Sequence, residues 1–411
     1  MSAVNTIATI ASIDTPITAT TATLRKEDQD VLSSLIQREP DTVIWGPMDR
    51  RSIRINVCVS GKPMTEMKQF VESSLERNKI GKIIIYTNSK VAAENGLKDA
   101  VQDILDKHKI EGCAMPFTGN NGIMMKNYIM TSFCPDEISS VGDLESIFCV
   151  IGTSAMECGV SSKEVTTGIS YGMPRSMYDL YQYLGRVDRM HDALPGQVSF
   201  SVILNVPTFM TMFIRAQKQC DVSMRSREER DIYEVLRFLI LPTQCYHVTM
   251  EHYLEDPDTE KNTEPCDICC PFCDDTYLHF ADKLHKDALI RVLQTQIYRD
   301  GNVQLINLVS IISDDKKKIK KMIYGAGFST KSQGKIHGLV LMMIALNIIE
   351  LIIDETKIGT QYIDKSDIMT RLGVTTVQTK NADDVDDYDS DNGEWGIQRI
   401  HSKPRFYLAV F

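Results

Sequence analysis

A group of closely spaced cysteines has the spacing of a metal site. Cys245 is followed after twenty residues by the run Cys266-Asp-Ile-Cys269-Cys270-Pro-Phe-Cys273. Thiolates two or three residues apart can bind one tetrahedral zinc ion together. Buried free cysteines are a common alternative, but five cysteines within 29 residues, beside charged loops, favour zinc. Four thiolates leave no open coordination position, so such a zinc ion would be structural.

Two arginines in the first half of the chain form a second candidate site. The segment from Ser176 to Arg189 reads SMYDLYQYLGRVDR. If the segment is helical, Arg186 and Arg189 are three residues apart and point the same way. A guanidinium pair placed in this way can clamp the phosphates of a nucleotide. A solvated basic turn is the alternative, and the segment alone does not decide between the two.

The elements that must position these residues alternate along the chain. Short apolar runs, typical of buried strands, alternate with segments of helical spacing. We expect strands at residues 53–59, 83–86, 147–151 and 198–206, and helices at residues 27–36, 65–78, 92–107 and 228–240. This alternation predicts an α/β fold, in which a parallel sheet has helices on both faces.

Several segments match, in order, the motifs of one helicase family. Residues 176–189 resemble the sixth motif of the RecQ-type DNA helicases, residues 152–161 the fifth, residues 84–90 the fourth and Thr21-Ala22-Thr23 the third. Residues 49–54 resemble the linker into the second motor lobe. The chain thus resembles the carboxy-terminal half of this ATP-dependent 3′–5′ helicase family, which unwinds DNA in recombination and repair. The resemblance implies a RecA-like sheet with flanking helices, a helical zinc-binding region and a winged-helix domain.

The resemblance also implies roles for single residues. Arg189 would be the arginine finger, Arg186 its phosphate-contacting neighbour, and Gln182 a residue of the nucleotide cleft. Gly159 and Gly185 would lie beside the bound nucleotide. The motor residues expected to face DNA are Thr21, Thr23, Asn88 and Ser154.

Departures from the family pattern bear on ATP hydrolysis. Glu157 stands where the fifth motif has a glycine, and Ser161 where it has an aspartate. Asp188 replaces a glycine of the sixth motif. A glycine that allows close backbone approach has therefore become an anion near the expected phosphates.

The ATP-binding motifs of the family are not found in the sequence. A P-loop needs Gly-Lys followed by Ser or Thr, but the Gly-Lys pairs here are followed by Pro63, Ile83 and Ile336. There is also no Asp-Glu-x-His box. In the family both precede the third motif, so we expect the first lobe to be missing. We therefore predict no ATPase activity for this chain alone, with ATP and Mg²⁺ bound only if a separate chain supplies that lobe.

The family also bears on the zinc ligands, because its zinc platform directly follows the second lobe. The ligand set that the resemblance implies is Cys245, Cys266, Cys269 and either Cys273 or Cys270. The fourth ligand stays open because the family spacing before the last cysteine is not reproduced from Cys269. His247 and His252 lie nearby, but structural or solvated roles suit them better.

Residues 308–350 resemble the winged-helix domain more loosely. Residues 348–354 and 361–364 are expected to pair as its hairpin, with the tip at residues 355–360. The lysines of this region could neutralise DNA phosphates, although a solvated helix face is an equal alternative. These lysines are Lys316, Lys317, Lys318, Lys320 and Lys321.

Composition adds only weak constraints. The net charge of the 411 residues is -10 and the pI about 5.4, whereas nucleic-acid-binding domains are usually basic. Six aspartates are concentrated in residues 383–391, which predicts a disordered acidic tail. No signal peptide and no membrane-spanning run of about 20 apolar residues is seen.

The expected organisation follows from these observations. Its parts are residues 1–45 as a remnant of the first lobe and linker, 46–207 as the second RecA-like lobe, 208–282 as the zinc-binding platform, 283–372 as the winged helix and 373–411 as the acidic tail. The expected partner is single-stranded or junction DNA, and family resemblance suggests the nucleus. Two alternatives remain: a non-enzymatic DNA-binding or interaction module, and the relic of a truncated helicase gene.

Overall fold

The computed structural model describes residues 26–36, 39, 41–42, 50–77, 81–134, 146–153, 156, 162–187, 198–219, 221–254, 264–266, 269–274, 333–347, 349–354 and 405–410. The chain divides into two compact units, Met1–Leu278 and His279–Phe411. Within the described ranges, no helix combines the length and the hydrophobicity that crossing a membrane requires.

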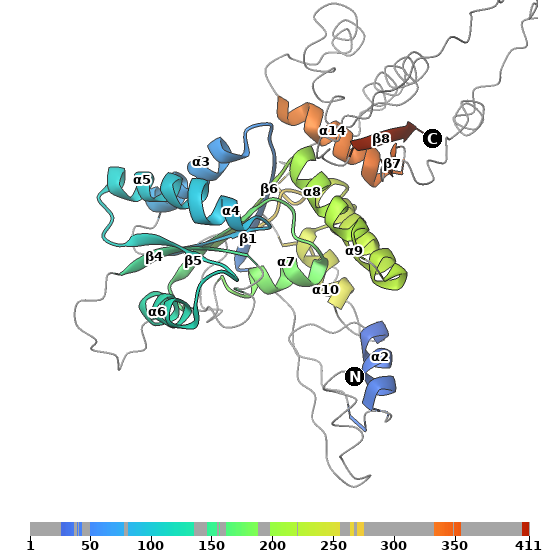
Figure 1. The fold of residues 1–411 in the computed structure, drawn as a ribbon, viewed down its shortest axis with the longest axis horizontal. Helices are drawn as coiled ribbons and strands as arrows, with labels where there is room; N and C mark the ends of the chain where they lie inside the picture. The colour runs from blue at the N-terminus through green and yellow to red at the C-terminus, as the bar shows by residue number, and fades with distance from the viewer. Residues whose placement is uncertain are drawn as a thin grey trace, which may run out of the picture. The chain divides into compact units, whose positions relative to one another are not determined.

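A parallel sheet forms the centre of the first unit (Figure 1). Its strands are β1 Ile53–Val59, β2 Lys82–Thr87, β3 Cys113–Phe117, β4 Ile147–Gly152, β5 Val165–Tyr171 and β6 Val198–Leu204. The strand order is β1-β6-β5-β2-β4-β3, and every neighbouring pair is parallel. Strands β2, β4 and β6 are buried along their whole length, as expected for a sheet covered on both faces.

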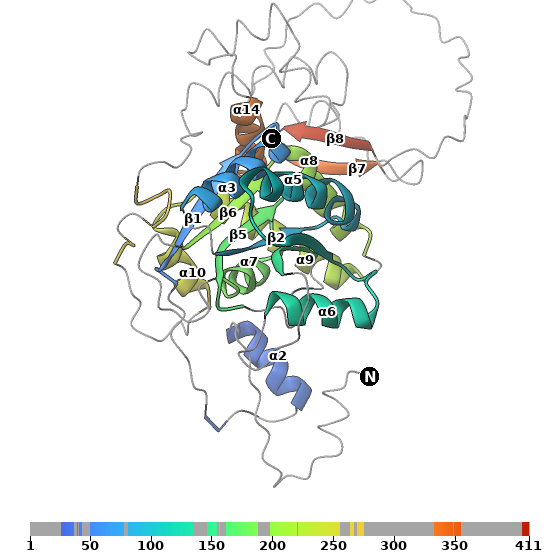
Figure 2. The same cartoon turned by 90° about the vertical axis from the view of Figure 1, so that its left-hand side faces the viewer.

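Helices lie on both faces of this sheet. The helical segments of the unit are α2 Lys26–Ile36, α3 Pro63–Arg77, α4 Lys90–Ala92, the π-helical turn η1 Ala93–Leu97, α5 Lys98–His108, α6 Ile123–Phe133, α7 Met177–Leu184, α8 Val206–Gln217, α9 Val222–Ile240 and α10 Tyr246–Leu254. Figures 1 and 2 show α3 and α5 on one face, and α6 and α7 on the other. The apolar sides of α3 and α5 pack on β2, β4 and β5 to form a continuous core.

The predicted parallel sheet with flanking helices is confirmed. The apolar runs that predicted strands correspond to β1, β2, β4 and β6, and the helical patterns to α2, α3, α5 and α9. Two strands were missed. Strand β3 contains Pro116, a residue that argues against a strand, and β5 has the mixed sequence VTTGISY. Neither sequence is therefore recognisable as an apolar run.

Gly168 allows β5 and β6 to pack closely. A Cβ atom at this position would lie 2.4 Å from Phe200 Cδ2 and 2.8 Å from Val187 Cγ2. We expect Gly168→Ala to lower the free energy of unfolding by about 1–3 kcal/mol, because buried neighbours must move. Urea denaturation followed by circular dichroism measures this loss. Gly96→Ala is the control, since its nearest neighbour would be Met64 Cε at 3.8 Å; equal losses in both variants would contradict the packing argument.

The second unit contains α14 Gln333–Ala345 and an antiparallel pair of strands, β7 Ile349–Asp354 and β8 Arg405–Val410. The hairpin was predicted to pair residues 348–354 with 361–364; among the described residues, β7 pairs with β8. Strand β8, whose sequence RFYLAV is rich in residues that favour strands, lies near the end of the segment predicted as a tail. The acidic run at residues 383–391 lies outside the described residues, and its disorder stays a prediction. Residues 361–364 and the lysines from Lys316 to Lys321 lie outside the described residues. The winged helix stays a prediction.

Candidate nucleic-acid interface and metal centre

The carboxyl ends of the parallel strands share one edge of the sheet, where α/β proteins usually bind their ligands. Polar residues follow three of these strands: Asn88 after β2, Thr118 after β3, and Arg175 four residues after β5. The segments that carry them lead directly into helical segments. This edge is therefore the candidate interface for a phosphate-containing ligand.

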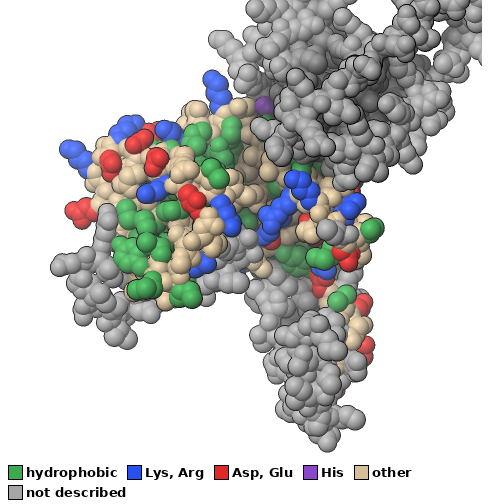
Figure 3. Space-filling model, in the orientation of Figure 1, with side chains coloured by type: hydrophobic (Ala, Val, Ile, Leu, Met, Phe, Trp, Pro, Cys, Tyr) green, Lys and Arg blue, Asp and Glu red, His purple; other side chains and the backbone are tan. Residues whose placement is uncertain are grey.

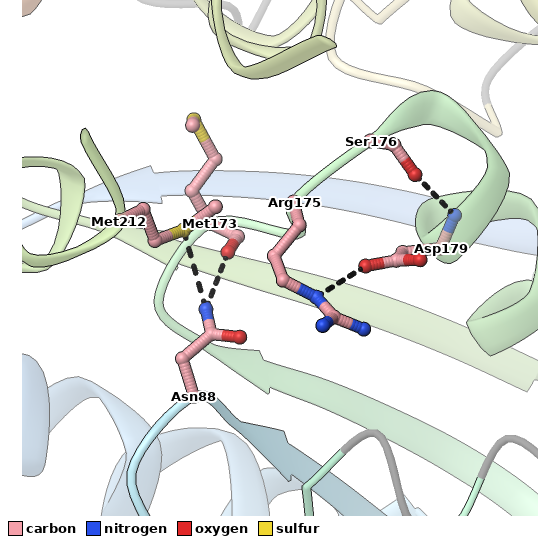
Figure 4. A network of polar contacts seen from close by, with 6 residues as sticks. All are labelled: Asn88, Met173, Arg175, Ser176, Asp179 and Met212. Atoms are coloured by element: carbon pink, nitrogen blue, oxygen red, sulfur yellow. Dashed lines mark hydrogen bonds and ion pairs between the residues drawn. The ribbon is translucent and has the colours of Figure 1, made fainter. Parts of the chain in front are cut away.

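Asn88 joins the end of β2 to the segment that follows β5. Its Nδ2 donates a hydrogen bond to the Met173 carbonyl oxygen at 2.9 Å and contacts Met212 Sδ at 3.2 Å (Figure 4). The amide group thus fixes the geometry of the edge. The predicted DNA contact of Asn88 stays a prediction.

Arg175 lies where the chain enters α7. Its Nε donates to Asp179 Oδ2 at 2.9 Å, and its side chain is about one-third exposed (31%). Ser176 Oγ accepts a hydrogen bond from the Asp179 backbone N–H at 3.1 Å and caps α7 (Figure 4). Such caps satisfy free N–H groups of the first helical turn. The pair keeps a partly exposed guanidinium at the carboxyl edge.

A second polar network at this edge was missed from the sequence. Glu94 Oε1 accepts hydrogen bonds from Thr118 Oγ1 at 2.7 Å and from Asn120 Nδ2 at 3.1 Å. Lys90 Nζ donates to Asn120 Oδ1 at 3.3 Å. Glu94 belongs to η1, and π-helical turns are frequent at functional sites. The loop sequence TGNNG, which directly follows Phe117 at the end of β3, is the signal that could have pointed to this network.

Helix α7 carries the residues of the predicted nucleotide cleft. It is fixed to the sheet by the stacked rings of Tyr86 and Tyr183, whose centroids lie 3.8 Å apart. Gln182 lies in the last turn of this helix, Gly185 and Arg186 directly follow it, and all three are half-buried. The structure thus places these three residues together, while their roles stay predictions.

The side chain of Arg50 lies beside the carboxy-terminal end of α7. Its guanidinium lies 5.8 Å from the centre of the Tyr181 ring, in cation–π geometry. A Cβ atom on Gly185 would lie 3.7 Å from Arg50 Nη2. The linker segment therefore adds an arginine beside the candidate cleft. The other residues predicted for the nucleotide or DNA lie outside the described residues: Thr21, Thr23, Ser154, Gly159, Arg189, Lys316, Lys317 and Lys320.

Four cysteines form the candidate metal centre. The sulfur atoms of the group all lie within 4.8 Å of one another, and its members are Cys245, Cys266, Cys270 and Cys273. The Cys245 and Cys270 sulfurs are 3.8 Å apart. A tetrahedron of Zn–S bonds of about 2.3 Å has sulfur–sulfur distances of about 3.8 Å, so the group fits zinc.

Cys273 and Cys270, between which the fourth ligand was left open, both belong to the group, whereas Cys269 was predicted as a ligand and is not a member. Instead, the Cys269 carbonyl oxygen accepts a hydrogen bond from the Ile55 N–H at 2.9 Å. Cys269 is therefore replaced by Cys270 in the candidate ligand set.

The thiols of the group influence one another. Hydrogen bonding with Cys266, and then with Cys270, lowers the pKa of Cys245. Hydrogen bonding with Cys245 raises the pKa of Cys266, and burial raises the pKa of Cys273 to about 12. A zinc ion would have to displace the remaining thiol protons, so its affinity should fall as the pH is lowered.

Comparison with known proteins agrees with this geometry. Residues 65–191 match the helicase conserved C-terminal domain. The ATP-dependent DNA helicase RecQ of Pasteurella multocida is 22% identical over 82% of this chain and 49% of that protein. The RecQ helicase of Haemophilus influenzae is 25% identical over 62% of this chain and 37% of that protein. The Hef helicase domain of Pyrococcus furiosus is 20% identical, with a TM-score of 0.26, over 38% of this chain and 28% of that structure.

The parallel sheet with flanking helices has the RecA-like fold, and residues 65–191 within it match the helicase conserved C-terminal domain. Within that class, the chain resembles the carboxy-terminal half of the RecQ-type helicases. It spans about half the length of the curated RecQ relatives, or less.

Proposed function

We propose that this chain is the nucleic-acid-binding half of a RecQ-type 3′–5′ DNA helicase. It binds single-stranded or junction DNA at the carboxyl edge of its sheet, and it unwinds DNA only together with an ATP-binding lobe. The observation that carries this proposal is the combination of a RecA-like sheet with a four-cysteine cluster, whose loop accepts a hydrogen bond from the outer strand β1 at the Cys269 carbonyl oxygen. The RecQ-type family combines these two parts in the same order.

The carboxyl edge offers groups that suit a nucleic-acid backbone. Lysine, arginine and asparagine side chains are among the groups that contact phosphates in protein–DNA complexes. Lys90 and Asn120 are exposed there, and Arg175 is partly exposed. Asn120 donates a hydrogen bond to Glu94 and accepts one from Lys90, and Arg175 donates to Asp179. A preformed edge of this kind supports binding to the sugar-phosphate backbone independently of sequence.

The proposal includes no ATP turnover by these 411 residues alone. Hydrolysis needs a phosphate-cradling P-loop and a magnesium-binding carboxylate, and the sequence holds neither motif. Steady-state ATP hydrolysis by the purified chain, with saturating single-stranded DNA, should therefore stay at the rate of a protein-free control. DNA-stimulated hydrolysis that scales with protein concentration would contradict this prediction.

A non-enzymatic DNA-binding module is the second candidate, favoured by the same lack of a P-loop. The two candidates differ in their response to an added lobe. Supplying the first lobe of a RecQ relative as a separate chain should produce DNA-stimulated hydrolysis if the chain is a helicase half. Arg186→Ala should abolish that rate, because Arg186 is the residue proposed to contact the phosphates beside the arginine finger. DNA binding without hydrolysis under these conditions would favour the module.

A further inference from the structure

The two outer strands of the sheet differ in how they are protected against pairing with other chains. Strands β1 and β3 lie at the two edges. An exposed edge strand presents unpaired N–H and C=O groups that can pair with another chain. Strand β3 contains Pro116, which lacks a backbone donor and disfavours such pairing. Strand β1, with the sequence IRINVCV, has no proline and is rich in residues that favour strands.

The segment that contains Cys266, Cys270 and Cys273, called the cysteine loop, covers the open edge of β1. The Ile55 backbone N–H donates to the Cys269 carbonyl oxygen at 2.9 Å. The neighbouring Arg54 forms an ion pair with Asp274, with Nη2 and Oδ2 2.6 Å apart. Both contacts involve the segment that contains Cys270 and Cys273 of the candidate metal centre. Figure 2 shows β1 at the outer side of the sheet, with the yellow segment of the cysteine loop beside it.

The cysteine loop bonds to a backbone N–H of β1 that faces the open edge of the sheet. Successive residues of a strand direct their N–H groups to opposite sides. Ile55 directs its N–H outward to Cys269, so Ile53, Val57 and Val59 share this outward direction. The residues between them pair with β6, and the ladder continues with Ser60 N–H donating to the Leu204 carbonyl oxygen at 2.9 Å. The loop therefore occupies a site on β1 where another strand would pair.

We propose that the metal-bound cysteine loop caps the β1 edge, and that metal loss converts this edge into a pairing surface for a second copy of the chain. Cys245 immediately precedes α10, whereas Cys266, Cys270 and Cys273 lie in the loop. A shared metal ion would tie the loop to α10 and so hold it against β1. Without that tie, the conformational entropy of the loop favours its release. Two copies of β1 can then pair about a twofold axis, as isologous interfaces do.

The proposal is tested on the full chain by removing and restoring Zn²⁺. Zinc content is measured first by emission spectrometry, and the protein is then treated with a chelator. Hydrogen exchange in residues 53–59 should become on the order of tenfold faster in the monomer, because the cap is lost. Sedimentation velocity at increasing protein concentration should then show dimers, and added Zn²⁺ should reverse both changes.

A proline variant separates edge pairing from general unfolding. The Val57 N–H faces away from β6, so Val57→Pro should keep the sheet intact but block pairing at the edge. After chelation this variant should stay monomeric, while wild type and the loop control Cys269→Ala associate. If Val57→Pro fails to fold by circular dichroism, Val57→Lys serves the same purpose, because lysine on an edge strand opposes pairing.

Three outcomes would overturn the proposal. The first is unchanged exchange in residues 53–59 after chelation. The second is equal self-association of wild type and the folded position-57 variant. The third is full protection of residues 53–59 in a preparation that holds no metal. None of these outcomes depends on helicase activity, so they are distinguishable from a failure of the proposed function.

Discussion

Replacing Cys270 by serine should abolish zinc binding, whereas Cys269→Ser should leave one zinc ion per chain. The Cys270 sulfur lies in the four-cysteine group, 3.8 Å from that of Cys245, and the Cys269 sulfur does not belong to the group. Loss of residues that only support metal ligands costs about 10–100-fold in affinity, so loss of a ligand should cost at least ~100-fold. The free energy of binding a structural zinc ion contributes directly to folding. The melting temperature of Cys270→Ser should therefore fall clearly below that of Cys269→Ser.

Emission spectrometry and thermal denaturation of the two variants measure this difference. The substitutions are chemically identical and lie at adjacent positions, so each controls for the other. Retention of zinc by Cys270→Ser together with its loss from Cys269→Ser would show that the alternative ligand set holds the metal. Full zinc in both variants would show that neither thiol is needed.

Reversing the charge of Lys90 should weaken binding to single-stranded DNA by about tenfold or more at low salt. Lys90 is exposed at the start of α4, on the carboxyl edge, and its Nζ lies 3.3 Å from Asn120 Oδ1. The Lys90→Glu variant loses one phosphate contact and places a negative charge where the DNA backbone is proposed to bind. The dependence of log K on log salt concentration should also become shallower, by about 0.7 for one contact to single-stranded DNA.

Lys107→Glu is the matched control for this change. Lys107 is 67% exposed near the end of α5, on the side of the sheet where the strands begin. Both substitutions change the net charge equally, so a general electrostatic effect would weaken both proteins alike. Fluorescence anisotropy with a labelled oligonucleotide should show less than about a threefold change for Lys107→Glu. Equal losses of DNA affinity in the two variants would contradict the proposal that the carboxyl edge is the binding surface.

The sequence predicted the strands that contain a recognisable apolar run or alternation, and it missed β5, where two threonines and a glycine interrupt the pattern. Strand β5 contains Thr167, whose Oγ1 lies 2.5 Å from Ser74 Oγ of α3 in a buried hydrogen bond. It also contains Gly168, where the Phe200 ring takes the space of a side chain. Both features depend on neighbours distant in the sequence. A hydrophobic pattern therefore could not identify this strand.

For the candidate site, the sequence predicted which residues could take part but not the role of each. The cysteine spacing predicted a metal centre, but Cys269 and Cys270 both lie within ligand distance along the chain. The turn of the loop decides between them, and the Ile55 hydrogen bond to the Cys269 carbonyl fixes that turn. Likewise, the sequence placed Asn88 near the interface but could not show that its amide holds Met173. Local spacing finds candidate residues, whereas their roles depend on contacts between separate elements.

The affinity of the zinc-loaded chain for single-stranded DNA, titrated across salt concentrations without nucleotide, tests the account most directly. We predict measurable binding whose log K falls linearly with log salt concentration, with a slope of about -0.7 for each phosphate contacted. A folded, zinc-loaded chain that binds no single-stranded DNA even at low salt would contradict the assignment to a helicase half.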